Sequence, residues 1–126
     1  IIDISSCTLL EESGIIKLVE ANTCIVKFIA SNCVNAITDE SLSYLAKNTR
    51  TNIEILDISS CSNVTNTGMM AFAEAKPEQF FTELYLGGLT QVTNAGFASI
   101  ISTCTKTLVL LNMSLNGQFE LTGEVC

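Results

Sequence analysis

Apolar residues recur along the chain in a short pattern, apolar-x-apolar-x-x, which is followed by cysteine in its first three copies. The residue after the pattern is number 7, 33, 61, 89 or 116, so successive copies lie 26, 28, 28 and 27 residues apart. Leu89 and Asn116 stand in the place of cysteine in the last two copies. In the third copy, alternation places Leu56 and Ile58 on one face of a strand and Asp57 on the other. The pattern predicts five strands, each opening a copy of one unit.

A helical period follows each of the first four predicted strands. Apolar residues pair at i and i+3, which is typical of a helix with one buried face. Polar pairs precede the stripes and are expected to accept hydrogen bonds from free N–H groups at the helix starts. Pro77 follows the third stripe, where it can end a helix. The stripes hold Ile15 and Leu18, Leu42 and Leu45, Met69 and Phe72, and Phe97 and Ile100; the polar pairs are Thr38-Asp39, Thr65-Asn66 and Thr93-Asn94.

One strand–helix unit of this size cannot bury its own apolar face, whereas stacked units bury it against one another. A step of about 20 to 29 residues with this apolar spacing is typical of leucine-rich repeats. We therefore predict an α/β fold, a right-handed leucine-rich-repeat solenoid (horseshoe) with parallel strands on the concave face and helices outside. We interpret residues 1–126 as about five repeats, the first and last incomplete, forming a fragment of a longer chain.

The subtype is suggested by the segments around the helix starts. Residues 64–69 (Val-Thr-Asn-Thr-Gly-Met) and 92–97 (Val-Thr-Asn-Ala-Gly-Phe) resemble the I-T-D-x-G-L core of cysteine-containing leucine-rich repeats. Cys7, Cys33 and Cys61 match the cysteine column of that family, and Cys24 and Cys104 lie near its second cysteine position. The resemblance implies a protein-binding role: such repeats serve as substrate receptors of F-box ubiquitin ligases and as scaffold subunits, including those of the dynein regulatory complex in cilia.

From this resemblance we predict a non-catalytic scaffold or adaptor that binds other proteins within a larger assembly, in the cytoplasm or in a ciliary axoneme. The alternative is the substrate-recognition region of an F-box ubiquitin ligase, although no F-box motif is visible in this sequence. A third hypothesis, from another class, is a receptor that holds a small molecule on its concave side. An F-box segment in the parent protein would distinguish the second hypothesis, and a bound ligand the third.

The charge and the apolar content of the chain limit the classes of partner that it is expected to bind. The chain has 13 acidic and 6 basic residues, a net charge of -7. This balance argues against binding nucleic acid, whose phosphates require a basic surface, and against binding an anionic membrane surface. No apolar stretch reaches the roughly 20 residues of a membrane-spanning helix. Among macromolecules, a protein is therefore the expected partner.

The residues that usually carry chemistry form no recognisable catalytic or metal-binding motif. The chain has six cysteines but no histidine and no C-x2-C spacing, so neither a zinc site nor a histidine-based triad is expected. We interpret the cysteines as small buried hydrophobes with free thiols. The acidic pairs Glu11-Glu12 and Asp39-Glu40 fit favourable charge at helix starts, and Gly87-Gly88 fits a tight turn. No cofactor is predicted.

The predicted concave face is therefore the candidate binding surface. Residues that alternate with the buried strand positions should point towards it. Ile29, Asp57, Glu83, Tyr85 and Asn112 are the predicted partner-binding residues. Tyr85 is of particular interest because tyrosine is enriched among the residues that contribute most to protein interfaces.

Overall fold

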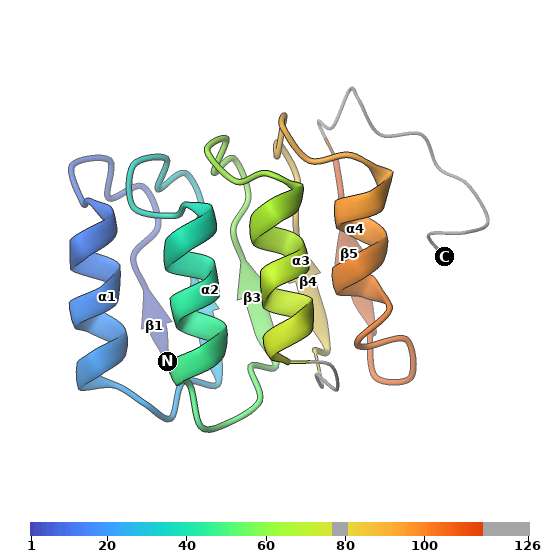
Figure 1. The fold of residues 1–126 in the computed structure, drawn as a ribbon, viewed down its shortest axis with the longest axis horizontal. Helices are drawn as coiled ribbons and strands as arrows, with labels where there is room; N and C mark the ends of the chain where they lie inside the picture. The colour runs from blue at the N-terminus through green and yellow to red at the C-terminus, as the bar shows by residue number, and fades with distance from the viewer. Residues whose placement is uncertain (77–80, 115–126) are drawn as a thin grey trace.

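The computed structural model describes residues 1–76 and 81–114, and within them strands and helices alternate along the chain (Figure 1). The five strands form one sheet in the order β1-β2-β3-β4-β5, and every neighbouring pair is parallel. The elements are β1 (Ile2–Asp3), α1 (Glu12–Ala21), β2 (Lys27–Ile29), α2 (Asp39–Asn48), β3 (Ile55–Asp57), α3 (Asn66–Ala75), β4 (Glu83–Tyr85), α4 (Asn94–Ile101) and β5 (Leu110–Asn112).

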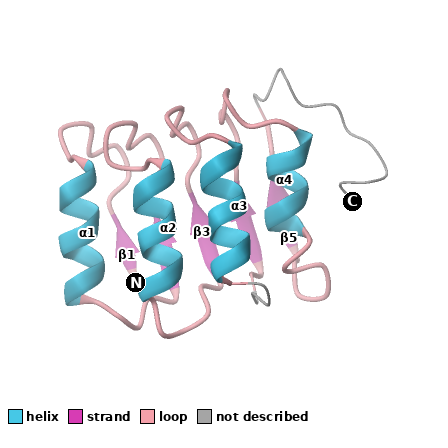
Figure 2. Cartoon of the chain, in the orientation of Figure 1, coloured by secondary structure: helices cyan, strands magenta, loops and turns pink. Residues whose placement is uncertain are grey.

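The four helices stand side by side in chain order on one side of the sheet, and loops join the ends of the two layers (Figure 2). Each successive strand and helix is therefore added next to the previous pair. This arrangement confirms the predicted α/β alternation and the parallel sheet. The predicted horseshoe curvature and the number of complete repeats stay predictions.

The core lies between the sheet and the helices. Phe28, Leu56 and Leu84 are aligned by the strand register, and all three are fully buried. Each sits at the middle of a three-residue strand whose two flanking residues are only half-buried. The predicted alternation across the sheet is therefore confirmed in β2, β3 and β4. Each of these three strands contributes one side chain to the core and two to the opposite face.

The predicted helical stripes form the other wall of this core. Ile15, both leucines of the second stripe and both residues of the third and fourth stripes are buried, whereas Leu18 is half-buried. Phe72 of α3 stacks on Phe81, which precedes β4, with ring centroids 5.8 Å apart. Because these side chains are buried between neighbouring units, each unit covers apolar side chains of the next unit.

The cysteine column behaves as predicted in its interior and differently at its start. Cys33 and Cys61 are fully buried, and Leu89 fills the same position in the fourth unit. Cys7, which we expected to be buried, is exposed. In the second and third units the thiol lies against the preceding strand, and β1 has no preceding strand within the described residues. Cys24 is also exposed, contrary to the expectation of buried thiols. The predictions for Pro77 and Asn116 lie outside the described residues.

Candidate protein-binding face of the sheet

Eight side chains stand at the first and last positions of β2 to β5 and point away from the helices, and we call this surface the open face. The strand register arranges them in two rows. Six are half-buried, and the two on β5 are exposed. One row holds Lys27, Ile55, Glu83 and Leu110, and the other holds Ile29, Asp57, Tyr85 and Asn112. All five predicted partner-binding residues therefore lie on the open face, four in one row and Glu83 in the other.

Polar and apolar side chains alternate on the open face in both directions. Each of the four strands carries one polar and one apolar residue on this face. A position that is polar on one strand is apolar at the same register on the next strand. On β3, for example, Ile55 precedes Asp57, whereas on β4 Glu83 precedes Tyr85. Neighbouring strands lie about 4.8 Å apart, so each apolar group has polar neighbours within reach. The surface is mixed throughout, as protein interfaces generally are.

Asp57 and Asn112 also shape the turns that follow their strands. The Asp57 Oδ1 accepts a hydrogen bond from the Ser59 N–H at 3.0 Å, and the Asn112 Oδ1 accepts one from the Ser114 N–H at 3.1 Å. Asp3 accepts the equivalent bond from Ser5, and this bond lowers the pKa of the Asp3 carboxyl. Such bonds stabilise turns made by Asp and Asn. Two of the predicted partner-binding residues therefore also have a structural task.

The turns after the strands require an unusual backbone conformation. Ser6, Asn32, Ser60 and Gly88 stand at equivalent positions and have φ values of 61°, 58°, 61° and 71°. This left-handed region is costly for most residues and open to glycine. The tight turn predicted for Gly87-Gly88 is confirmed at Gly88.

Tyr85 is tied to its own strand by its hydroxyl. The Tyr85 Oη donates a hydrogen bond to the Glu83 Oε1 at 2.6 Å. This bond, followed by burial and the negative charges of Glu83 and Asp57, raises the pKa of the Tyr85 phenol. The phenol is therefore protonated at neutral pH, and it is held beside two carboxylates on a half-buried surface.

A ladder of side chains joins neighbouring units on the helix side, and the sequence interpretation missed it. The Asp39 carboxylate accepts hydrogen bonds from the Thr65 N–H at 2.8 Å and from the Thr65 Oγ1 at 2.6 Å. In the next unit, the Asn66 Oδ1 accepts from the Thr93 N–H at 2.9 Å, and the Asn66 Nδ2 donates to the Thr93 Oγ1 at 2.8 Å. The acid or amide at a helix start thus holds the helix start of the following unit.

The first rung of this ladder uses a glutamate, whose side chain is one methylene group longer than that of aspartate. The Thr38 Oγ1 donates to the Glu12 carboxylate, and Thr38 also forms a reciprocal capping box with Ser41. Thr38 and Thr65 accept helix N–H groups as predicted, whereas Thr93 caps its helix without a side-chain hydrogen bond. We interpreted these polar pairs as caps of their own helices. The same polar residue types recur at one position of successive units, and this recurrence is the sequence signal for the contact between units.

Two further ladders lie at the turns between strand and helix. Asn35, Asn63 and Gln91 each donate a side-chain amide hydrogen to a backbone carbonyl of the preceding unit, at 3.1, 2.8 and 2.6 Å. The Cys33 thiol donates to the Ile4 carbonyl at 2.9 Å, and the Cys61 thiol donates to the Ala30 carbonyl at 3.2 Å. The thiols of Cys33 and Cys61 therefore donate hydrogen bonds in addition to filling space in the core.

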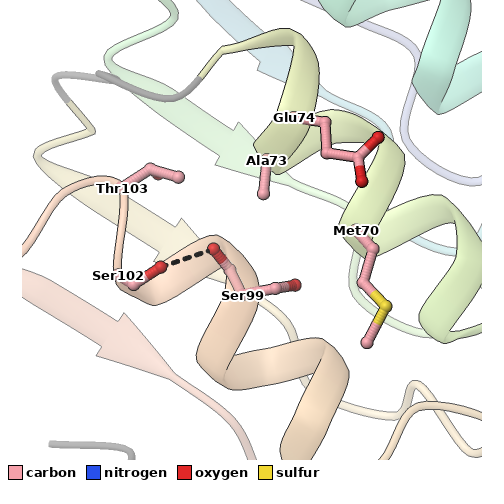
Figure 3. A pocket seen from close by; sticks show the side chains of 6 residues that line it. All are labelled: Met70, Ala73, Glu74, Ser99, Ser102 and Thr103. Atoms are coloured by element: carbon pink, nitrogen blue, oxygen red, sulfur yellow. Dashed lines mark hydrogen bonds between the residues drawn. The ribbon is translucent and has the colours of Figure 1, made fainter.

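A shallow groove lies between α3 and the end of α4 (Figure 3). Met70, Ala73 and Glu74 line it from α3, and Ser99, Ser102 and Thr103 line it from α4 and the residues after it. Among the described residues, no group of three or more His, Cys, Asp or Glu side chains is placed to hold a metal ion. None of the described helices is long and apolar enough to cross a membrane.

The comparison with known families concerns a segment of the third unit. This segment contains β3 and the greater part of α3. Residues 50–73 match the family model described as Leucine Rich repeat. The match supports a leucine-rich repeat family. Together with the alternating helices and parallel strands, it fits a leucine-rich-repeat-like fold. Domains of this kind generally mediate protein–protein interactions. No curated protein matches the chain.

Proposed function

We propose that the chain is a non-catalytic protein-binding module whose partner lies across the open face. The observation that carries the proposal is the strand register, which lines up Ile29, Asp57, Tyr85 and Asn112 in one row. This row and its neighbour are accessible on four adjacent strands, whereas the opposite side of the sheet is covered by helices. The mixed composition and the half-buried tyrosine favour a protein partner.

The proposal extends to the setting of the module. The open face would be the concave side of a leucine-rich-repeat solenoid, and the module would be one part of a larger cytoplasmic assembly. The resemblance to cysteine-containing repeats favours a scaffold subunit of the kind found in the dynein regulatory complex of ciliary axonemes. The same resemblance supports the alternative, the substrate-recognition region of an F-box ubiquitin ligase.

Crosslinking mass spectrometry on the native complex tests both the face and the setting. Lys27 lies on the open face, whereas Lys17 and Lys47 are exposed on α1 and α2. Lys27 is expected to crosslink to a partner, and the two helix lysines are expected to serve as controls without that crosslink. Crosslinks from the helix lysines alone would contradict the proposed face.

The identity of the crosslinked protein distinguishes the settings. Axonemal or other filament-associated subunits would support the scaffold. A Skp-type adaptor or a cullin in the same complex would replace it with the ligase alternative.

A further inference from the structure

We propose that the partner places an arginine or lysine side chain on the open face between β3 and β4, against Tyr85, Asp57 and Glu83. The inference rests on the proposed function and adds the chemistry of the partner to it. Three properties of this part of the sheet support it: the placement of two carboxylates around an aromatic ring, the excess of negative over positive charge on the open face, and the apolar side chains beside them.

The placement follows from the register and from one hydrogen bond. Asp57 and Tyr85 are register partners on neighbouring strands, so their backbones lie about 4.8 Å apart. Glu83 is two residues before Tyr85 on the same face, and its carboxylate accepts the Tyr85 hydroxyl at 2.6 Å. The phenol is thus bordered by one carboxylate along its strand and by another across the sheet. A cation at this position can contact both carboxylates and the ring.

The charges here are not balanced within the open face. Its one basic residue is Lys27, which stands on β2 in the same row as Glu83, with Ile55 between them. At about 4.8 Å per strand, Lys27 and Glu83 are separated by roughly 10 Å of backbone. The local hydrogen bonds of Asp57 and Glu83 leave their negative charges in place. A partner with a cation supplies the missing charge, whereas an acidic or phosphorylated partner is repelled.

The surroundings favour a long basic side chain over a small cation. Ile55 lies directly across from Glu83, and Ile29 lies directly across from Asp57. The methylene groups of arginine or lysine can cover such apolar residues while the charged end remains at the carboxylates. An arginine can in addition bind a carboxylate through two hydrogen bonds and stack on an aromatic face. We therefore expect arginine to be preferred.

Selection of random linear peptides displayed on phage against the full chain tests this inference. Parallel selections use the Asp57→Asn/Glu83→Gln double variant and a matched Glu40→Gln/Glu74→Gln variant, which removes the same charge from exposed positions on α2 and α3. Asp57→Asn keeps the oxygen that accepts the Ser59 N–H, because Asn112 makes the equivalent bond. Circular dichroism and thermal unfolding establish that both variants fold like the wild type.

Peptides selected on the wild type are expected to carry arginine or lysine. They should lose on the order of tenfold in affinity on the open-face double variant and none on the helix variant. Peptides that bind without a basic residue and ignore the double variant, yet lose binding to Tyr85→Ala, would overturn this inference and leave the proposed function standing. Peptides that ignore Tyr85→Ala and the double variant alike would instead contradict the open face as the binding surface.

Discussion

Gly68 is predicted to be a position where one added methyl group weakens the contact between two units. Gly68 is the third residue of α3, and it lies against Asp39 at the start of α2. A Cβ at Gly68 would collide with the Asp39 Oδ1 and would lie 2.9 Å from the Asp39 Cα. Real Cβ contacts are not found below 3.0 Å, so Gly68→Ala must displace the carboxylate that binds Thr65.

The magnitude follows from the bonds that the displaced carboxylate makes. Asp39 accepts two hydrogen bonds from Thr65, at 2.8 and 2.6 Å. Hydrogen bonds to charged groups contribute roughly 1.5 to 3 kcal/mol each, and partial exposure favours the low end. Alanine recovers at most about 1 kcal/mol over glycine through helix propensity. We expect Gly68→Ala to lower the free energy of unfolding by about 2 kcal/mol.

Urea unfolding of the full chain, followed by circular dichroism, measures this change. Gly14→Ala is the matched control, because its added Cβ would meet the tip of the flexible Leu10 side chain, which can move aside; its cost should stay within about 0.5 kcal/mol. In an Asp39→Ala background both bonds are already absent, so Gly68→Ala should cost less by at least about 1 kcal/mol, although its contact with the Cα of residue 39 remains. An equal cost in both backgrounds would refute the proposed role of Asp39.

Three further outcomes are expected. Leu56→Ala should lower the free energy of unfolding by roughly 2 to 5 kcal/mol in urea titrations, whereas Ile55→Ala, on the open face, should cost clearly less; equal costs would contradict the assignment of the two faces. Burial raises the pKa of the Cys61 thiol to about 12 from its ordinary value of 9.0. Because the unfolded thiol ionises first, stability should fall between about pH 9 and 12, by at most about 1.4 kcal/mol per pH unit. Cys61→Ser should reduce that slope, and an unchanged slope would contradict the assignment to Cys61. In the native protein at pH 8, peptide mapping after brief alkylation should find Cys7 and Cys24 labelled and Cys61 protected; rapid labelling of Cys61 would argue against its burial.

The buried half of the fold could be predicted from the sequence because its signals are periodic. Leu56 and Ile58 follow the two-residue period of a strand, and Met69 and Phe72 follow the period of a helix. Each is buried in the structure. Burial is decided by the face on which a side chain lies, and that face is fixed by spacing within one unit. Placement of the predicted residues on the open face followed from the same rule.

Contacts between units could not be predicted in this way. Asp39 was interpreted as favourable charge at the start of its own helix, but its carboxylate binds Thr65 of the next unit. The pairing depends on how two units are stacked, which the spacing within a unit does not contain. The exposure of Cys7 was missed for the same reason, because burial of a thiol in this column requires a preceding strand. Recurrence of the same residue types at one position of successive units is the signal that remains in the sequence.

The three ladders have a consequence for the open face. They join neighbouring units through helix starts, turns and buried thiols, and these groups lie away from Ile55, Glu83 and Tyr85. Each of β2, β3 and β4 gives its central side chain to the core and presents the two flanking ones on the open face. The identity of those two side chains can therefore change the chemistry of the surface while the stack keeps its geometry. Asp57 and Asn112 are partial exceptions, because the turns after them require an oxygen acceptor, a demand that aspartate and asparagine both meet. A surface built on this plan is suited to a partner that runs across several strands and is recognised by two side chains from each.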